Sequence, residues 1–417
     1  MRTYEISKPD RTLRGRIRLP GSKSIANRAL IIRALSAEPV ELHRLAASQD
    51  TQTLKSLLDA DPIVYDCGPA GTTFRFLTAY LALRPNVQVL TGSARMLRRP
   101  IGPLVEALRD LGAEIDYLEE EGYPPLSIGE ARALRGGNLT IAADTSSQFI
   151  SALLLIAPLL DRGLSLRLAG TVVSRPYIQM TLDLMAHFGV QHRWKDNTIK
   201  IAPQDYAGGA LTVEADWSAA SYYYSMAALA DEVDLELEGL FERSVQGDQA
   251  IVGIMHGLGV ETTYTERGVR LTKADGQRRR LLERDFLDCP DLAQTVAVTC
   301  AGTGTMGLFS GLETLKIKET DRIAALKQEL QRVGTYFYKA PPKMSKRQDR
   351  TYYIAEGKAD WSEPPRFATY EDHRMAMALA PLALLGPVRI DEPDVVGKSY
   401  PDFWTDLRTL GFGIKEA

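Results

Sequence analysis

Apolar and polar positions alternate along this chain in a helix-then-strand pattern that repeats. Five times, an amphipathic helix ends in an apolar residue and a glycine, and an alternating strand follows. The glycines are Gly112, Gly189, Gly259, Gly334 and Gly411, at intervals of 77, 70, 75 and 77 residues. Glycine closes a helix cheaply in the left-handed conformation, so the pattern predicts a repeated structural unit.

A sixth, shorter unit is expected to end near residue 60, where no glycine and strand follow. Each unit is also predicted to hold a second kind of helix, polar or glycine-rich at its start and then apolar nearly all round. These helices are expected to begin near Ser22, Gly71, Ser146, Asp216, Asp288 and Glu371. A helix that is apolar on every face belongs in a core. Six such units predict an α/β fold of two domains with three units each.

Composition narrows the possible partners and compartment. The 417 residues carry a net charge of −3 and include no basic arm, which argues against a nucleic-acid partner. The longest apolar run, 149–160, is too short to span a bilayer and contains Pro158. No secretory signal is recognised at the N-terminus, so we expect a cytoplasmic protein. The three cysteines are far apart and odd in number, which disfavours a disulfide framework or a zinc site.

The first segment with candidate chemistry is Leu19-Pro20-Gly21-Ser22-Lys23-Ser24. A glycine and two hydroxyls open a helix that carries Lys23 and Arg28 within its first two turns. Free backbone N–H groups, hydroxyls and two cations at one place predict a site for a phosphate or carboxylate. A serine-capped surface helix with two solvated cations is the alternative.

Other expected helix starts carry similar groups. Gly71-Thr72-Thr73 and Ser146-Ser147-Gln148 are small and polar, although serine and threonine are also ordinary caps. Three arginines fall between positions 95 and 99, which favours an anion site over a solvated loop.

Three segments of the C-terminal half combine acids and bases. Lys318 and Arg322 have i,i+4 spacing, which predicts one helical face with Glu319 beside them, or else a salt-bridged surface helix. Asp372-His373-Arg374 stands at the mouth of an apolar helix, where charges usually have a task or a partner. Asp291 follows Pro290 at another expected helix start and could be only a cap. Gly397-Lys398-Ser399 is not a nucleotide-binding loop, because position 392 holds Glu instead of the required glycine.

These segments together closely resemble the 5-enolpyruvylshikimate-3-phosphate synthase family across essentially the whole chain. The matching segments occur in the family's order: Pro20-Gly21-Ser22-Lys23-Ser24, Ala70-Gly71-Thr72, Arg95-Met96 with Arg99-Pro100, Ser146-Ser147-Gln148-Phe149, Ser174-Arg175-Pro176-Tyr177, Lys318-Glu319-Thr320-Asp321-Arg322, Asp372-His373-Arg374-Met375-Ala376, and Lys398 with Pro401.

The resemblance implies two inside-out α/β barrel domains, each of three pseudo-repeated units with buried parallel helices. One domain would span 21–215, with its first unit shortened, and the other 1–20 plus 216–417, with the active site in a cleft that closes between them. The implied reaction transfers the enolpyruvyl group of phosphoenolpyruvate to the 5-hydroxyl of shikimate 3-phosphate and releases phosphate. The resemblance implies no metal or organic cofactor and no membrane partner, and we expect a monomer.

The resemblance also assigns residues to the substrates. Shikimate 3-phosphate is expected to contact Lys23, Ser24, Arg28, Ser146, Ser147, Gln148, Ser174, Tyr177, Asp291, Thr314 and Lys318. Phosphoenolpyruvate is expected to contact Lys23, Gly71, Arg95, Gln148, Arg322, Arg374 and Lys398. Asp291 is the candidate to accept the hydroxyl proton and Glu319 to deliver the carbon proton, with Lys23 assisting in either role.

Two other functions compete with this interpretation. The sister enolpyruvyl transferase that acts on UDP-N-acetylglucosamine shares fold and donor, but usually carries a reactive cysteine in the loop that corresponds to 93–97. This loop holds no cysteine here. A non-catalytic relative that binds shikimate phosphate as a sensor would have a similar sequence.

Overall fold

Two compact units make up the chain. The computed structural model describes residues 2–129, 134–144, 146–276, 278–344, 347 and 350–417. Gly21–Val213 form one unit, the continuous unit, and Met1–Pro20 with Glu214–Ala417 form the other, the discontinuous unit. The chain therefore leaves the discontinuous unit after residue 20 and returns to it at residue 214.

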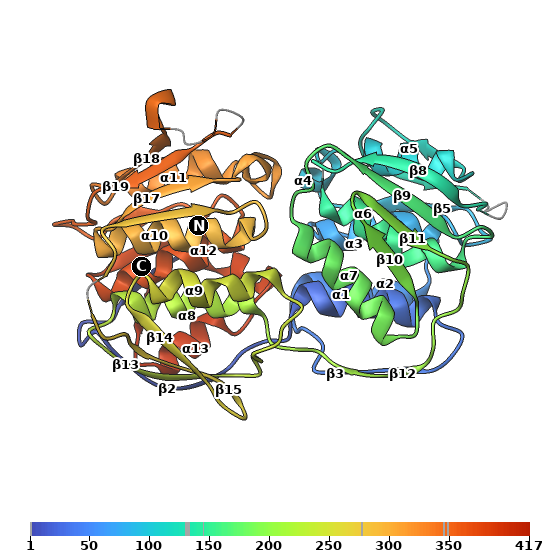
Figure 1. Cartoon of the computed structure of the whole chain (residues 1–417). Coiled ribbons are helices and arrows are strands. Elements are labelled where there is room, and N and C mark those ends of the chain that lie inside the picture. The colour runs from blue at the N-terminus through green and yellow to red at the C-terminus, as the bar shows by residue number, and fades with distance from the viewer. Residues whose placement is uncertain (1, 130–133, 145, 277, 345–346, 348–349) are drawn as a thin grey trace. The chain divides into compact units, whose positions relative to one another are not determined.

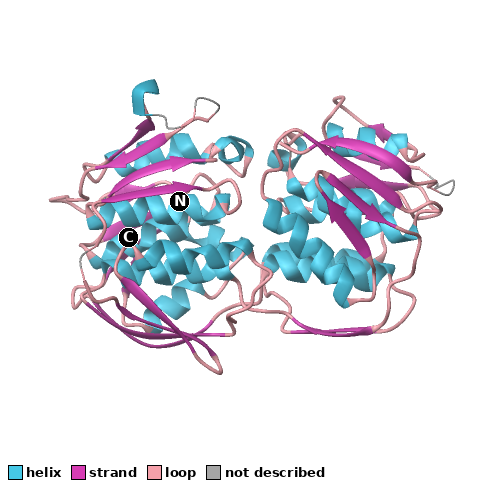
Figure 2. Ribbon diagram, viewed as in Figure 1, coloured by secondary structure: helices cyan, strands magenta, loops and turns pink. Residues whose placement is uncertain are grey.

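The continuous unit has helices inside and strands outside (Figures 1 and 2). Its helices are α1 (Lys23–Leu35), α2 (Gln49–Ala60), α3 (Gly71–Leu81), α4 (Ala94–Leu97), α5 (Gly102–Asp110), α6 (Ser147–Ile156) and α7 (Arg175–His187). Its strands are β3 (Val40–His43), β4 (Val64–Asp66), β5 (Gln88–Thr91), β6 (Ile115–Tyr117), β7 (Leu126–Ile128), β8 (Gly137–Ala142), β9 (Leu164–Ala169), β10 (His192–Lys195), β11 (Thr198–Ile201) and β12 (Gly209–Thr212).

The discontinuous unit has the same arrangement, with helices enclosed by sheets (Figure 2). Its α-helices are α8 (Trp217–Leu229), α9 (Ile251–His256), α10 (Ala293–Thr303), α11 (Arg322–Gln331), α12 (His373–Leu379) and α13 (Phe403–Thr409). Its strands are β1 (Thr3–Ser7), β2 (Thr12–Arg18), β13 (Glu232–Glu238), β14 (Val260–Tyr264), β15 (Gly268–Lys273), β16 (Leu281–Asp285), β17 (Met306–Ser310), β18 (Tyr336–Lys339), β19 (Tyr353–Glu356), β20 (Arg366–Phe367), β21 (Val388–Asp391) and β22 (Gly413–Glu416).

The apolar helices predicted from the sequence form the two cores. Helices α1, α3 and α6 contact one another, and so do α8, α10 and α12. In α8 every residue but one is buried, from Trp217 to Leu229. Burial on all faces explains why these helices lack a polar stripe, since each is surrounded by other helices and sheets.

Two of these helices begin differently from the expectation. A 3₁₀ turn, η3 (Pro290–Leu292), precedes α10, so the α-helix starts at Ala293 and not near Asp288. Tyr370 and Glu371 both have positive φ angles, of 57° and 55°, and α12 begins only after Asp372. Proline at the first turn and an aspartate cap fix these two starts.

The predicted glycine terminators are confirmed. Gly112, Gly189, Gly259, Gly334 and Gly411 all have positive φ, between 73° and 103°, directly after a helix and before a strand. In this conformation a side chain would be strained, which is why the same residue type recurs.

The end of α2 achieves the same turn without a glycine. Asp61 adopts the left-handed conformation there, with φ of 45°. Its carboxylate accepts hydrogen bonds from the hydroxyl of Tyr65 at 2.5 Å and from Arg84 at 2.6 Å. The strand that follows, β4, pairs with β5 and so belongs to the next sheet.

Among the described residues, the strands form five four-stranded sheets and one two-stranded sheet. The two-stranded sheet joins β3 to β12 in parallel, so this part of the continuous unit has fewer strands than the others. The first two strands of the chain lie in the discontinuous unit. Strand β1 pairs with β21 and β22, and β2 runs parallel to β13.

Cationic side chains bind the backbone carbonyl groups at the C-terminal end of α8. The Lys273 ammonium donates to the carbonyl groups of Ala227 at 3.0 Å and Ala230 at 2.8 Å. Arg278 donates to the carbonyl of Ala228 at 2.8 Å, and Arg11 to that of Leu229 at 3.0 Å. These bonds satisfy carbonyls that have no partner within the helix and place positive charge at its negative end.

Replacing Lys273 with methionine should therefore lower the free energy of unfolding by about 1–3 kcal/mol at neutral pH. Burial, together with the charge of Arg278, lowers the pKa of Lys273 to about 8 from its ordinary 10.5. Between these values the unfolded chain binds more protons than the folded one, so wild-type stability rises with pH relative to the variant. Urea unfolding from pH 7 to pH 10 should show the deficit of Lys273→Met widening above pH 8. The exposed Lys415→Met is the control, and an equal response of both variants would contradict this role.

Candidate functional site

A buried arginine organises the charged groups of the discontinuous unit. Arg322 is the first residue of α11, and its side chain is only 1% exposed. Its guanidinium donates to Asp372 at 2.7 Å, to Asp291 at 3.1 Å and to Glu319 at 2.9 Å. Carboxylates that match both the charge and the donors of a guanidinium in this way stabilise it when it is buried.

Helix caps supply part of this network. Asp321 caps α11 by accepting from the backbone N–H of Ile323 at 3.0 Å, which places Arg322 at the helix mouth. Asp372 caps α12 through the backbone N–H of Arg374 at 2.9 Å and binds Arg322 with the same carboxylate. One carboxylate therefore joins the starts of two helices.

Asp291 lies among three cations. Its oxygens are 2.8 Å from Arg374 Nη2, 3.1 Å from Arg322 Nη1 and 3.7 Å from Lys318 Nζ. Burial alone would raise the pKa of this carboxyl. The surrounding positive charges outweigh burial and hold the pKa of Asp291 well below its usual range.

Three further predicted site residues lie close to this network in the chain or in space: Glu319, Lys398 and Thr314. Lys398 Nζ is 3.5 Å from Glu319 Oε1, while the other carboxylate oxygen of Glu319 accepts from Arg322. The buried hydroxyl of Thr314, in the 3₁₀ turn η4 (Glu313–Ile317), has no hydrogen-bond partner among the described atoms. Lys318 follows η4 directly as its C-cap and lies outside α11. The expectation that it shares a helical face with Arg322 is therefore wrong. Both cations nevertheless reach Asp291.

The continuous unit contains a second buried arginine with a different environment. Arg28 donates to the hydroxyls of Thr181 at 2.7 Å and Ser151 at 3.1 Å, and to the carbonyls of Ser24 at 2.8 Å and Tyr177 at 3.2 Å. Among the described residues no carboxylate contacts it, and burial lowers its pKa to about 10. A buried cation held by neutral groups leaves its charge for an anionic ligand.

Asp50, in α2, connects the starts of three helices in the same unit. Its buried carboxylate is 2.9 Å from the ammonium of Lys23, the first residue of α1. The Thr73 hydroxyl in α3 donates to the backbone carbonyl of Asp50 at 3.1 Å. The N-terminal turns of α1, α2 and α3 thus meet at one place.

The start of α6 joins that of α3. Gln148 Nε2 donates to the Thr72 hydroxyl at 3.0 Å. Beside it, a Cβ on Gly71 would lie 2.5 Å from Nη1 of Arg75 and 2.5 Å from Nη1 of Arg99. Only a glycine lets both guanidiniums approach the backbone so closely, and helix N-termini with cations beside them favour bound anions.

The structure places the remaining predicted residues without linking them all to these groups. Ser146 caps α6 by accepting from the backbone N–H of Gln148 at 3.3 Å, and Ser147 is the first residue of that helix. Ser174 precedes α7 with a φ of 54°. Arg95 is the second residue of α4, two positions after the cap Ser93. Their proposed contacts with a substrate stay predictions.

Residues of these networks that were not among the predicted ligands include Asp50, Asp372, Ser218 and Asp248; the Ser218 hydroxyl lies 3.4 Å from Arg374 Nη2 and donates to Asp248. The charged run before α12 pointed to Asp372, because an acid beside an arginine at an apolar helix start needs a partner. No local pattern marks the other three, since their partners are far away in the sequence.

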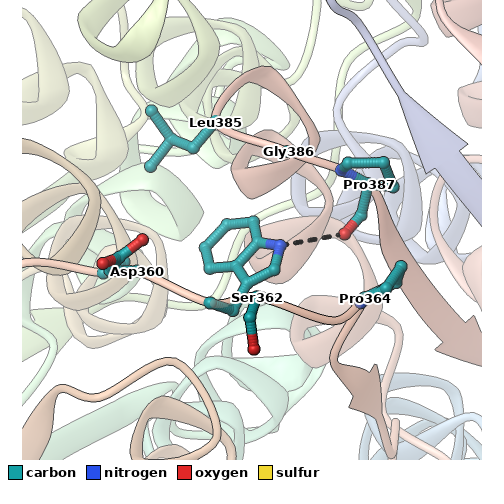
Figure 3. A pocket seen from close by; sticks show the side chains of 8 residues that line it. Asp360, Ser362, Pro364, Leu385, Gly386 and Pro387 are labelled. Atoms are coloured by element: carbon teal, nitrogen blue, oxygen red, sulfur yellow. Dashed lines mark hydrogen bonds between the residues drawn. The ribbon is translucent and has the colours of Figure 1, made fainter.

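A separate cavity of about 210 Å³ lies on the discontinuous unit and is lined by Ala359, Asp360, Trp361, Ser362, Pro364, Leu385, Gly386 and Pro387 (Figure 3). The indole N–H of Trp361 donates to the carbonyl of Pro387 at 3.1 Å. Asp360 is the charged residue of this lining, so the cavity does not suit an anionic ligand.

Two further properties concern the described part of the chain. Within it, His, Cys, Asp and Glu side chains do not form a group that could hold a metal ion. None of its helices has both the length and the apolar character that crossing a membrane requires.

Cation-rich helix N-termini of this kind are typical of proteins that bind small anionic molecules. Comparison with known proteins gives the family. The family model of EPSP synthase (3-phosphoshikimate 1-carboxyvinyltransferase) matches residues 7–60 and 53–407. A 3-phosphoshikimate 1-carboxyvinyltransferase of Bacteroides fragilis (strain YCH46) is 49% identical over 414 residues, covering 99% of this chain and 98% of that protein. One from Bordetella petrii is 37% identical and covers 98% and 97% of the two chains.

The fold is also found in a solved structure. The solved structure of EPSP synthase from Acinetobacter baumannii covers 100% of both chains with a TM-score of 0.81 at 20% sequence identity. The chain belongs to the EPSP synthase (3-phosphoshikimate 1-carboxyvinyltransferase) family.

Replacing Arg322 with methionine should lower the free energy of unfolding by about 3–5 kcal/mol, because three carboxylates lose their shared cation. Adding Asp372→Asn to this variant should recover part of the loss, since one buried negative charge is removed. Urea unfolding measures both effects. The exposed pair of Arg270 with Asp234 provides the control, and Arg270→Met should cost far less stability than Arg322→Met. Similar losses in both arginine variants would show that Arg322 has no special place in the unit.

Proposed function

We propose that this chain transfers the enolpyruvyl group of phosphoenolpyruvate to the 5-hydroxyl of shikimate 3-phosphate, giving 5-enolpyruvylshikimate 3-phosphate and phosphate. The observation that carries this proposal is the gathering of cations at helix N-termini in both units. Each substrate brings one phosphate and one carboxylate. Guanidinium groups, lysines and helix N-termini are the groups that hold such anions in position to react.

The two substrates divide the site residues between them in this proposal. Shikimate 3-phosphate is bound by Lys23, Ser24, Arg28, Ser146, Ser147, Gln148, Ser174, Tyr177, Asp291, Thr314 and Lys318. Phosphoenolpyruvate is bound by Lys23, Gly71, Arg95, Gln148, Arg322, Arg374 and Lys398. The buried, unmatched charge of Arg28 supports the first set, and the guanidiniums around Gly71 support the second.

The reaction is an addition followed by an elimination, and each step needs two proton transfers. In the addition step the hydroxyl oxygen loses its proton and bonds to the central carbon of phosphoenolpyruvate, while the methylene carbon gains a proton. In the elimination step the new methyl group loses a proton, the bond to the phosphate oxygen breaks, and the departing phosphate takes up a proton. Asp291 takes the hydroxyl proton and Glu319 serves the carbon, with Lys23 assisting either transfer.

The ion pairs of Asp291 bear on its basicity. With Arg374, Lys318 and Arg322 around it, the carboxylate is a weak base, since its pKa is held well below the usual range. Substrate anions that take over hydrogen bonds from these cations would weaken that hold. Substrate binding would then raise the pKa of Asp291 and make it a better proton acceptor.

The alternative acceptor, a UDP-amino sugar, has less support. The relatives and the family model are those of the shikimate enzyme. Cys67, Cys289 and Cys300 are all buried, and burial raises the pKa of each thiol, so none resembles a reactive cysteine.

We also propose that the protein works as a monomer in the cytoplasm. Light scattering after size-exclusion chromatography tests the first point, with a mass near 46.1 kDa expected.

Asp291→Asn should bind shikimate 3-phosphate but turn over at least about a hundredfold more slowly, because an amide cannot accept the hydroxyl proton. Phosphate release from both substrates measures turnover, and calorimetry measures binding. Asp288→Asn, at an exposed position three residues earlier, should keep normal turnover. Near-normal turnover of Asp291→Asn would transfer the role of base to Lys23 or Glu319. Binding of shikimate 3-phosphate by the wild type without any turnover would favour the non-catalytic sensor.

Arg28→Met should weaken the binding of shikimate 3-phosphate by about ten- to a hundredfold, the usual effect of losing a charge-assisted hydrogen bond. Arg33→Met in the same helix removes a cation that pairs with Asp59 at 2.7 Å, and its binding should be unchanged. Calorimetric titration with shikimate 3-phosphate measures the affinity of both variants. Equal affinities would remove Arg28 from the proposed ligands.

A further inference from the structure

One buried carboxylate near Asp291 has no part in the mechanism described above. Asp248 lies in the 3₁₀ turn η2 (Gly247–Ala250) and is 3% exposed. Its Oδ2 accepts a short hydrogen bond from the hydroxyl of Ser218, and its Oδ1 has no hydrogen-bond partner among the described atoms. A carboxylate buried with so few partners is costly, so its presence calls for an explanation beyond packing.

The segment that carries Asp248 holds the first turn of α8. Gln246 Oε1 accepts from the backbone N–H of Trp217 at 3.2 Å, and Gln246 Nε2 donates to the carbonyl of Ala215 at 2.8 Å. Asp248 then binds the side chain of Ser218, the next residue of the helix. The start of α8 is therefore fixed from one side by two residues of a single loop.

The other side of this helix start faces Arg374. The Ser218 hydroxyl oxygen is 3.4 Å from Arg374 Nη2, and the Tyr222 hydroxyl, one turn later, is 3.5 Å from Nη1. Arg374 Nη2 also donates to Asp291 at 2.8 Å. A continuous line of hydrogen bonds thus runs from Asp248 through Ser218 and Arg374 to Asp291.

We propose that Asp248 is a positioning residue for the reaction, which acts through the Ser218 hydroxyl to orient the guanidinium of Arg374 against Asp291. A hydroxyl has one proton. When Ser218 gives that proton to Asp248, its lone pairs are directed toward Arg374 and accept from Nη2. Without Asp248 the hydroxyl can rotate, and Arg374 Nη2 loses a fixed acceptor in addition to Asp291.

The pKa of Asp248 bears on whether its charge is needed to hold the Ser218 hydroxyl. Burial, together with the charge of Asp291, raises the pKa of Asp248 to about 7. A neutral carboxyl still presents a carbonyl oxygen that accepts from Ser218. An asparagine at this position presents the same oxygen, whereas an alanine presents none.

This inference rests on the proposed function, in which Arg374 binds phosphoenolpyruvate. In Asp248→Ala the KM for phosphoenolpyruvate should rise about tenfold, with a smaller change in kcat, and Asp248→Asn should stay within about threefold of wild type. Ser218→Ala should reproduce the effect of Asp248→Ala, and the double variant should be no worse than either single one, because both act on one line of contacts.

The hydroxyl–carboxylate pair of Thr3 and Asp391 is a control in the same unit. Thr3 Oγ1 donates to the buried Asp391 at 2.7 Å, and Asp391 also binds a different arginine, Arg366, at 2.8 Å. Asp391→Ala should lower stability without raising the KM for phosphoenolpyruvate. If it raises that KM as much as Asp248→Ala does, Asp248 only supports the fold and the proposal is wrong.

A second readout does not depend on turnover. Nitrogen-15 spectra of the arginine side chains, with the Arg374 signals assigned through Arg374→Lys, should show shifted Nη resonances in Asp248→Ala and Ser218→Ala. The same resonances should be unchanged in Asp391→Ala. Unshifted Arg374 signals in both Asp248→Ala and Ser218→Ala would overturn the positioning role. If both variants show these shifts but the wild type releases no phosphate, the result would refute the proposed function alone.

Discussion

The discontinuous unit depends on a single buried positive charge, that of Arg322. Its guanidinium binds Asp372, Glu319 and Asp291, which come from three different segments of the chain. None of these acids could stay ionised at this depth without a cation, and Arg322 could not stay buried without them. The starts of α10, α11 and α12 must therefore meet at one point. The same requirement brings Asp291 beside Arg374 and Lys318, where its chemistry is set.

Much of the fold could be predicted because the signals involved are local. A glycine with positive φ after a helix reflects only its own backbone, so Gly112 and its four counterparts could be recognised without knowing any partner. Asp61 carries the same conformation but could not be recognised, because its turn depends on Tyr65 and Arg84. The start of α10 was placed too early for a related reason. Pro290 fits the first turn of a helix, but here that turn is a 3₁₀ turn.

The candidate site was predictable in its residues and not in its pairings. Polar helix starts and the resemblance pointed to Lys23, Asp291 and Arg374, and the structure shows which groups each of them contacts. That Lys23 pairs with Asp50, or that Asp248 reaches Arg374 through Ser218, depends on how distant helices pack. Helical periodicity predicted one helix through Lys318 and Arg322, and this prediction is wrong. Asp321, which lies between them, caps α11, so the helix begins only at Arg322.

The pairing of β1 has a consequence for how this protein is made. Thr3 lies opposite Asp391, and Tyr4 opposite Glu416, so the first strand completes its sheet only with the last strands of the chain. The continuous unit has all its strands within residues 21–213 and can be complete while the ribosome is still translating the rest. During that time β1 is tethered to a folded unit without its partners, and its exposed edges wait for about half of synthesis, whereas β13, the partner of β2, follows soon after residue 213. Folding during synthesis thus begins with the continuous unit in the middle of the chain, and the N-terminal strand is among the last segments to pair.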